Sequence, residues 1–193
     1  MRRFVSDVHI DEHDKRFTLE VDDEGVEYYA YNGDIIYSNA NIVFDFLHPV
    51  MVGGNIKCKG HISSRSSLGA GGTILAGVSI YSQEDIFAKE GIHSGGGIIG
   101  HAISTDGSIY AKNSIEASGS IRAAGDITAD RGGIRSGFDI EAGKNIYVRS
   151  RIFAGMNGYA DSSDCQNTIR CERFRGELGY GILLLTESWG GHG

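Results

Sequence analysis

The sequence predicts an all-β fold, a single-stranded parallel β-solenoid of about five to six three-sided coils with a β-rich cap at each end. The first observation is that an aliphatic residue returns every six positions from Ile56 to Ile152, with one interval of five and one of seven. The second is that the residue two places after each aliphatic is small, from Cys58 to Ala154. No helix has a period of six, whereas a short strand with two inward residues followed by a turn does.

Residues 1–50 are expected to form the N-terminal cap. Residues 16–21 and 25–31 have the pattern of two strands joined by a turn, and Asn32-Gly33 is a pair favoured in tight hairpin turns. Residues 41–47 are expected to form a further strand. A cap is needed because an open stack of strands exposes unpaired backbone groups and an apolar end.

Residues 51–157 are expected to form the solenoid, with three hexads, or about 18 residues, in each coil. The interval of five, from Ile98 to Ile103, is expected to shorten one corner, and the interval of seven, from Ile127 to Ile134, to lengthen another. Burial of each aliphatic side chain contributes about 2 kcal/mol before the opposing cost of backbone ordering.

Residues 158–193 break the repeat and are expected to form a C-terminal β cap and tail. Residues 168–188 have the pattern of two strands around a glycine-containing turn, with an apolar run from Ile182 to Leu185.

The negative charge is confined to the predicted N-terminal cap. Residues 1–50 hold eleven acidic and four basic residues, which accounts for the whole net charge of −7, and they hold about half of the aromatic residues. Residues 51–193 carry fourteen residues of each sign and show no basic face, which argues against direct nucleic-acid binding. A small basic cluster near the C-terminal end is interpreted as solvated: Arg149, Arg151, Arg170, Arg173 and Arg175.

The composition favours a reducing compartment. The chain has three cysteines, Cys58, Cys165 and Cys171, an odd number without the spacing of a metal site. Cys165 and Cys171 would pair only in an oxidising compartment, and reduced thiols are the expectation.

No apolar run is long enough to span a membrane, and the first residues lack the apolar core of a secretion signal. We therefore expect a location in the bacterial cytoplasm, that of a phage-infected host included.

No group of residues predicts catalysis, a cofactor or a metal. His61, His93 and His101 occupy different positions of the hexad, so they are not expected to converge across neighbouring coils as a metal site would require. No loop interrupts the hexads, and no phosphate-binding glycine motif is present. His9 and His13 lie among aspartates, which leaves open a stray divalent ion beside the simpler interpretation of a solvated acidic terminus.

Residues 106–155 resemble the repeats of bacterial polymer-forming β-helix proteins, the bactofilin-like group, and more closely the GxIxA hexads of uncharacterised bacterial and phage proteins. The resemblance extends over residues 54–186. It implies a right-handed β-helix, and for bactofilins a filament that needs no nucleotide. The chain departs from bactofilins because both ends are expected to be capped, which works against end-to-end polymerisation.

The features together predict a non-enzymatic binding or scaffold protein. A rigid acidic surface with tyrosines suits a partner with a basic surface. A concrete form is a phage or mobile-element inhibitor, similar to anti-CRISPR proteins, that blocks the nucleic-acid-binding site of a bacterial defence complex. Two alternatives stay open: a bactofilin-like self-assembling protein, and an acidic head that only aids solubility. The predicted partner-binding residues are Asp22, Asp23, Glu24, Glu27, Tyr28, Tyr29 and Asp34.

Overall fold

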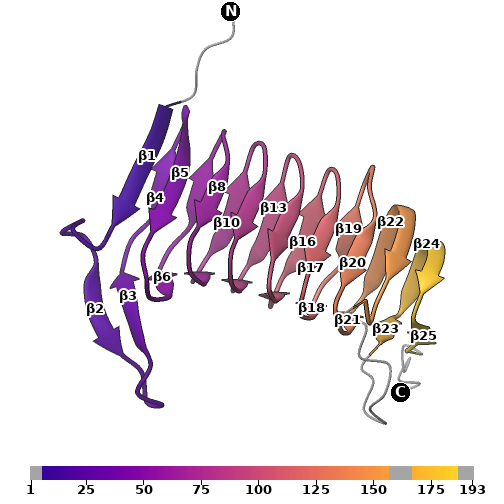
Figure 1. The fold of residues 1–193 in the computed structure, drawn as a ribbon. Coiled ribbons are helices and arrows are strands. Elements are labelled where there is room, and N and C mark those ends of the chain that lie inside the picture. Colours follow the sequence, from indigo (N-terminus) through magenta and orange to yellow (C-terminus); the bar gives the residue numbers. More distant parts are fainter. Residues whose placement is uncertain (1–5, 157–166, 187–193) are drawn as a thin grey trace, which may run out of the picture.

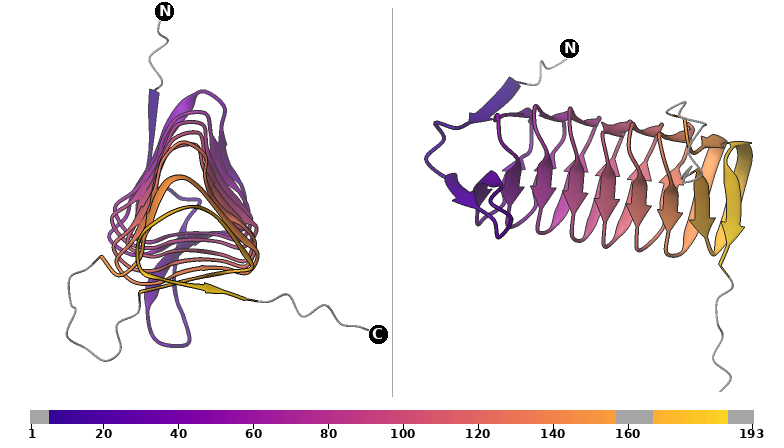
Figure 2. Two further views of the ribbon diagram at one scale, coloured as in Figure 1. Left: turned by 90° about the vertical axis from the view of Figure 1, so that its right-hand side faces the viewer. Right: turned by 60° about the horizontal axis from the view of Figure 1, so that its bottom comes forward.

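The computed structural model describes residues 6–156 and 167–186, which form 25 strands and no helix. The strands wind into an elongated stack with a triangular cross-section (Figures 1 and 2). All strand pairs are parallel except one, between two strands near the N-terminus. The predicted parallel β-solenoid is confirmed, with about eight coils instead of five to six. None of the described residues belongs to a helix long and apolar enough to span a membrane.

Each regular coil contributes one short strand to each of three faces, which we call A, B and C. Face A contains β4 (Ile35–Tyr37), β7 (Ile56–Cys58), β10 (Thr73–Ala76), β13 (Gly91–Ser94), β16 (Ser108–Ala111) and β19 (Ile127–Ala129). Face B contains β5 (Ala40–Asp45), β8 (Ile62–Ser64), β11 (Ile80–Ser82), β14 (Ile98–Gly100), β17 (Ile115–Ala117) and β20 (Ile134–Ser136). Face C contains β6 (Val50–Val52), β9 (Leu68–Ala70), β12 (Ile86–Ala88), β15 (Ile103–Thr105), β18 (Ile121–Ala123) and β21 (Ile140–Ala142).

The ends of the stack add longer strands to the same faces. At the N-terminal end these are β1 (Ser6–Asp11) on face B, and β2 (Thr18–Val21) with β3 (Glu27–Tyr31) on face C. At the C-terminal end they are β22 (Asn145–Phe153) and β24 (Arg173–Tyr180), which each run from face A to face B, followed by β23 (Thr168–Cys171) and β25 (Ile182–Leu185) on face C.

The core consists of columns of aliphatic side chains that run along the stack. Ile56, Ile74 and Ile92 are successive Cα partners on face A, and all three are fully buried. Equivalent columns line faces B and C. The residue between the two inward positions of each strand points outward, so each face also carries an outward column, one side chain per coil.

Both irregular intervals are absorbed at corners, as predicted. Ile103 pairs with Ile86, 17 residues earlier, and Ile134 pairs with Ile115, 19 residues earlier. Neither offset disturbs the aliphatic columns, because the missing or extra residue lies in the corner and the next aliphatic side chain again points inward.

Small residues allow the coils to approach closely at the corners. Gly95 stacks over Gly77, and a Cβ on Gly95 would collide with the Gly77 carbonyl oxygen. Inward serines link neighbouring coils at the corner between faces B and C: the Ser82 hydroxyl donates to the Ser66 carbonyl at 2.8 Å, and Ser136 donates to the Gly119 carbonyl at 2.6 Å. These bonds satisfy hydroxyl groups that are otherwise buried among apolar side chains.

The N-terminal segment forms one predicted hairpin and lacks a second. β2 and β3 pair antiparallel, so the hairpin predicted from residues 16–21 and 25–31 is confirmed. The hairpin turn predicted at Asn32-Gly33 is wrong, because β3 pairs with β6 on face C and β4 pairs with β7 on face A. Asn32 and Gly33 form a corner, where the chain changes face and each strand finds its partner one coil further along.

Aromatic side chains pack together at this end of the core. The ring of Phe17 lies 5.1 Å from that of Phe46 and 5.5 Å from that of Tyr31, measured between centroids. Tyr29 lies 4.8 Å from Phe46 on the other side. Among the described residues, no further coil is stacked on the outer side of the first one. The tilted rings supply the apolar area that covers this end of the aliphatic columns.

The C-terminal strands continue the stack. β24 and β25 flank Gly181, whose φ of +118° suits glycine, but they do not pair with each other. β24 pairs with β22, and β25 pairs with β23, both in parallel. The additional coils thus lie at both ends, in β4–β6 and in β22–β25, where the six-residue repeat is no longer regular.

Candidate partner-binding surface

The β2–β3 hairpin carries the densest negative charge in the described chain. Residues 18–31, which we call the acidic hairpin, contain five carboxylates and no basic residue. In the end-on view of Figure 2 the hairpin extends beyond the triangular outline of the stack. Its position exposes these carboxylates to a partner on several sides.

The tip of the hairpin is held by Asp22. Its Oδ1 atom accepts hydrogen bonds from the backbone N–H of Glu24 at 2.9 Å and of Val26 at 2.8 Å. A further bond joins Gly25 N–H to the Asp22 carbonyl at 3.0 Å. Asp22 therefore shapes the turn, whereas Asp23 and Glu24 extend from it with exposed side chains.

The remaining hairpin residues differ in role. The Tyr28 hydroxyl donates to Glu20 Oε2 at 3.0 Å, and this bond raises the pKa of the phenol above its usual value. Glu27 is exposed and lies 3.7 Å from the His48 Nε2 atom. Tyr29 packs inward on Phe46, so it stabilises the hairpin and offers only part of its surface.

Asp34 has a different role from the other predicted binding residues. Its Oδ1 atom accepts hydrogen bonds from Asn55, one from the backbone N–H at 2.6 Å and one from Nδ2 at 3.0 Å. These bonds lower the pKa of the Asp34 carboxyl, with the backbone bond as the largest cause. Asp34 links two coils and does not line the cavity described below.

The same bond recurs at five further places in the stack where an aspartate or asparagine precedes the inward aliphatic. In each case the side-chain oxygen accepts from the backbone N–H at the matching place in the next coil. The pairs are Asn41 with His61, Asn55 with Thr73, Asp85 with Ala102, Asp126 with Asn145 and Asp139 with Thr168. An aspartate or asparagine directly before the inward aliphatic is a pattern that is visible in the sequence. Asp34 fits this pattern, which identifies it as a residue that links two coils.

A cavity of about 410 Å³ lies between the acidic hairpin and the first coils of face C. We call it the hairpin groove. Val26 and Tyr28 line it from the hairpin, and Met51, Gly69 and Phe87 line it from the outward column of face C. Asp22 and Asp85 are its only charged lining residues.

Gly69 allows the Met51 side chain to lie across the floor of the groove. It is the only glycine at the outward middle position of the hexads between Ile56 and Ile152. A Cβ at Gly69 would collide with the Met51 Sδ atom, so the thioether occupies space that a side chain would take elsewhere. The exceptional glycine was visible in the sequence, but the position of the hairpin beside this part of face C was not.

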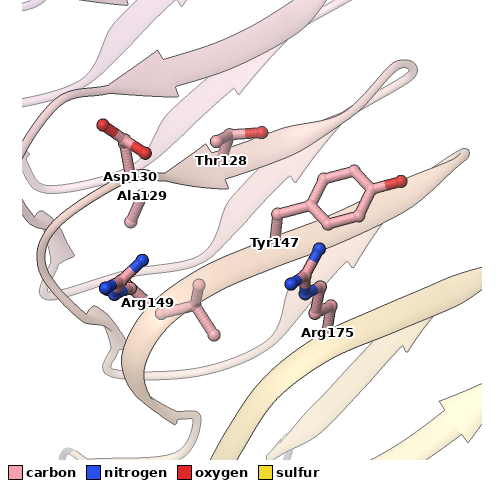
Figure 3. Close-up of a pocket in the computed structure, with 7 residues that line it drawn as sticks. Thr128, Ala129, Asp130, Tyr147, Arg149 and Arg175 are labelled. Atoms are coloured by element: carbon pink, nitrogen blue, oxygen red, sulfur yellow. The ribbon is translucent and has the colours of Figure 1, made fainter.

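A second cavity, of about 290 Å³, lies on face A near the C-terminal end. Figure 3 shows Thr128, Asp130, Tyr147, Arg149 and Arg175 around it. Tyr147 and Arg175 are Cα partners on β22 and β24.

The five arginines of the basic cluster near the C-terminal end divide into those with an ion pair and those without one in the described residues. Arg151 lies 2.6 Å from Glu177, and Arg170 lies 3.3 Å from Glu141. Arg149, Arg173 and Arg175 form no ion pair with any acid in residues 6–156 and 167–186. The cavity in Figure 3 also contains Asp130, so its lining carries both signs of charge.

The histidines of the solenoid lie apart. His101 Nδ1 is 2.8 Å from the Ser118 hydroxyl at an exposed corner. The half-buried His93 ring lies 6.5 Å from that of Tyr110, and burial lowers the pKa of its imidazole. In the part of the chain that the structure describes, no three His, Cys, Asp or Glu side chains lie close enough to hold a metal ion.

Comparison with protein-family models, with curated proteins and with solved structures found no match for this chain.

Proposed function

We propose that this protein is a non-enzymatic binding protein that presents its acidic hairpin and hairpin groove to a protein partner with a basic surface. One observation carries the proposal: a segment with five carboxylates and no lysine or arginine lies beside a largely apolar cavity at the same end of the stack. Negative potential increases the rate of encounter with a basic surface, and an apolar cavity supplies buried area once contact is made.

The solenoid supports this role by holding the surface rigid. Met51, Gly69 and Phe87 lie on successive coils whose strands are hydrogen-bonded in register, and the hairpin is joined to the same face through β3 and β6. A preorganised surface loses little conformational freedom on binding, which favours affinity.

In its concrete form, the protein is an inhibitor that occupies the nucleic-acid-binding site of a bacterial defence complex in the cytoplasm. Surfaces that bind phosphates are rich in lysine and arginine, and a row of fixed carboxylates attracts the same side chains. The resemblance to phage proteins with GxIxA hexads supports this setting.

The proposal is tested with a charge-reversal triplet, Asp23→Lys, Glu24→Lys and Glu27→Lys, which leaves Asp22 and its turn intact. The control triplet, Asp106→Lys, Asp130→Lys and Glu172→Lys, makes the same change in net charge at exposed carboxylates elsewhere. Proteins captured from bacterial lysate by each immobilised variant are quantified by mass spectrometry. Loss of a captured protein with the hairpin triplet and its retention with the control is expected. Equal capture by both triplets would contradict the proposal.

Self-assembly is the alternative, and one observation favours it. β25 lies at the end of its sheet, pairs only with β23 among the described strands, and exposes Ile182, Leu184 and Leu185. An apolar edge strand is a template for pairing with another chain. Sedimentation at low and at physiological salt decides: a monomer under both conditions excludes this alternative.

A further inference from the structure

We propose that the hairpin groove is a receptor for a single arginine side chain of the basic partner. The inference rests on the proposed function and specifies the chemistry that the groove recognises. It follows from three properties of the groove: an apolar floor, aromatic walls and two fixed carboxylates.

The floor and walls suit the aliphatic and planar parts of arginine. Met51 lies over Gly69 and forms the floor, Phe87 lines the groove from the next coil, and Tyr28 lines it from the hairpin. A guanidinium group stacks on aromatic rings, and its methylene stem packs on apolar surface. The volume of about 410 Å³ is small for a ligand pocket, so it accommodates a side chain with little of its backbone.

The two carboxylates are held in place before a ligand arrives. Asp22 uses Oδ1 to bind the hairpin backbone, and Asp85 uses Oδ1 to bind Ala102 N–H at 2.9 Å. The Oδ2 atom of each accepts no hydrogen bond from the described residues. Each carboxylate is thus oriented through one oxygen and keeps the other for a cationic donor.

Other occupants leave part of this chemistry unsatisfied. A purely apolar side chain would fill the floor but offer nothing to the carboxylates, and an anionic group would be repelled by both. A lysine ammonium reaches one carboxylate as a point charge and lacks the plane that stacks on an aromatic ring such as Tyr28 or Phe87. Arginine has five donors in a rigid fork, which suit two acceptors on different elements.

The three methionines make the groove observable. Met51 lies in the groove and Met156 near the other end of the stack. The protein labelled with ¹³C at the methionine methyl groups is titrated with Nα-acetyl-arginine N-methylamide, and a Met51→Leu variant assigns the signal. We expect saturable shifts of the Met51 methyl resonance and none for Met156. The citrulline analogue, a neutral isostere, serves as the matched ligand control, and the lysine analogue tests the role of the planar fork.

Two variants test the contacts. Asp85→Asn keeps an oxygen that accepts from Ala102 N–H but removes the charge, so binding of the arginine probe should weaken roughly tenfold. Phe87→Ala removes one ring and should weaken binding of arginine more than binding of lysine. The inference is overturned if the Met51 methyl group does not respond to the arginine probe, or if citrulline shifts it equally.

The two proposals fail in different ways. If the arginine probe leaves Met51 unchanged while the hairpin triplet still abolishes capture, the arginine receptor is excluded and the binding function stands. If the probe binds but both triplets capture partners equally, the receptor stands as a site and the proposed function is excluded.

Discussion

Asp34 and Asn55 are joined by two hydrogen bonds that cross from one coil to the next. The Asp34 Oδ1 atom accepts from the Asn55 backbone N–H at 2.6 Å and from its Nδ2 atom at 3.0 Å. Asn55 Oδ1 in turn accepts from Thr73 N–H at 3.1 Å, so the link extends over three coils on the same corner. The first coil is therefore attached to the regular stack by side chains as well as by its strands.

We expect the Asp34→Ala variant to unfold at a lower temperature than the wild type. The substitution removes the acceptor of both bonds and leaves the Asn55 N–H without its partner at the corner. Thermal unfolding followed by circular dichroism measures the difference. Asp23→Ala is the matched control, because Asp23 is an exposed acid whose side chain forms no bond with the described residues. Equal unfolding temperatures for Asp34→Ala and Asp23→Ala would show that the link contributes nothing.

The stabilisation by Asp34 should depend on pH. Hydrogen bonds from Asn55 lower the pKa of Asp34 in the folded state below its value of 3.8 in the unfolded chain. The charged form is therefore favoured by folding, so the contribution is complete above pH 3.8 and is lost as the pH falls through the folded pKa. Asn at this position keeps an acceptor but carries no charge.

The measurement is the difference in unfolding temperature between wild type and Asp34→Asn at pH 7 and at successively lower pH. The difference should be largest at neutral pH and shrink below about pH 4. A difference that stays constant down to pH 2 would mean that the charge of Asp34 has no part in the link.

The inward alanine positions should reject larger side chains. Ala111 is fully buried on β16 between Ser94 and Ala129 of the neighbouring coils, whereas Ala117 on β17 retains slight exposure. Leucine at position 111 should cost about 1–3 kcal/mol of unfolding free energy, since the coils cannot separate without breaking strand pairs. Ala117→Leu should cost less.

Chemical denaturation of both variants provides the comparison, with Lys112→Leu as the control at an exposed neighbouring position. If Ala111→Leu were as stable as this control, the core would have more space than the buried columns indicate.

The two described cysteines should react slowly with thiol reagents. Cys58 and Cys171 are buried, and burial raises the pKa of each thiol, which keeps the reactive thiolate scarce at pH 8. Cys165 lies outside the described residues, so the Cys165→Ser variant isolates the other two. We expect negligible modification by a disulfide reagent at pH 8 and rapid modification of two thiols after denaturation. Fast reaction of the folded variant would be inconsistent with buried sulfur atoms.

The sequence was sufficient for the solenoid because every inward position carries its own signal. Ile86 and Ile103 lie in the same column although one corner between them is unusually short, so the column can still be followed in the sequence. The number of coils was underestimated because Ile35, Ile42 and Val50 occupy the same columns at unequal spacing. At the C-terminal end, the last coils were also missed, because a long connection without the six-residue repeat separates β22 from β23.

The candidate site was only partly predictable for a related reason. The charge of the hairpin is a property of composition, and the sequence shows it directly. The groove depends on where the hairpin lies relative to Met51, Gly69 and Phe87, and nothing local in the chain specifies that contact. The charge of Asp34 favours a place on the binding surface, whereas its position directly before the inward Ile35 predicts the bonds to Asn55 that the structure shows.

The corners that absorb intervals of five and seven residues have a consequence for the dimensions of the molecule. Because the columns tolerate such differences, the length of the stack depends on the number of coils and hardly on the number of residues in each. Removal or duplication of one coil would move the hairpin groove and the arginine-bearing end closer or further apart by one strand spacing, about 4.8 Å. The separation between the two ends is therefore quantised, and variants that differ by whole coils would form a graded series of spacers with unchanged ends.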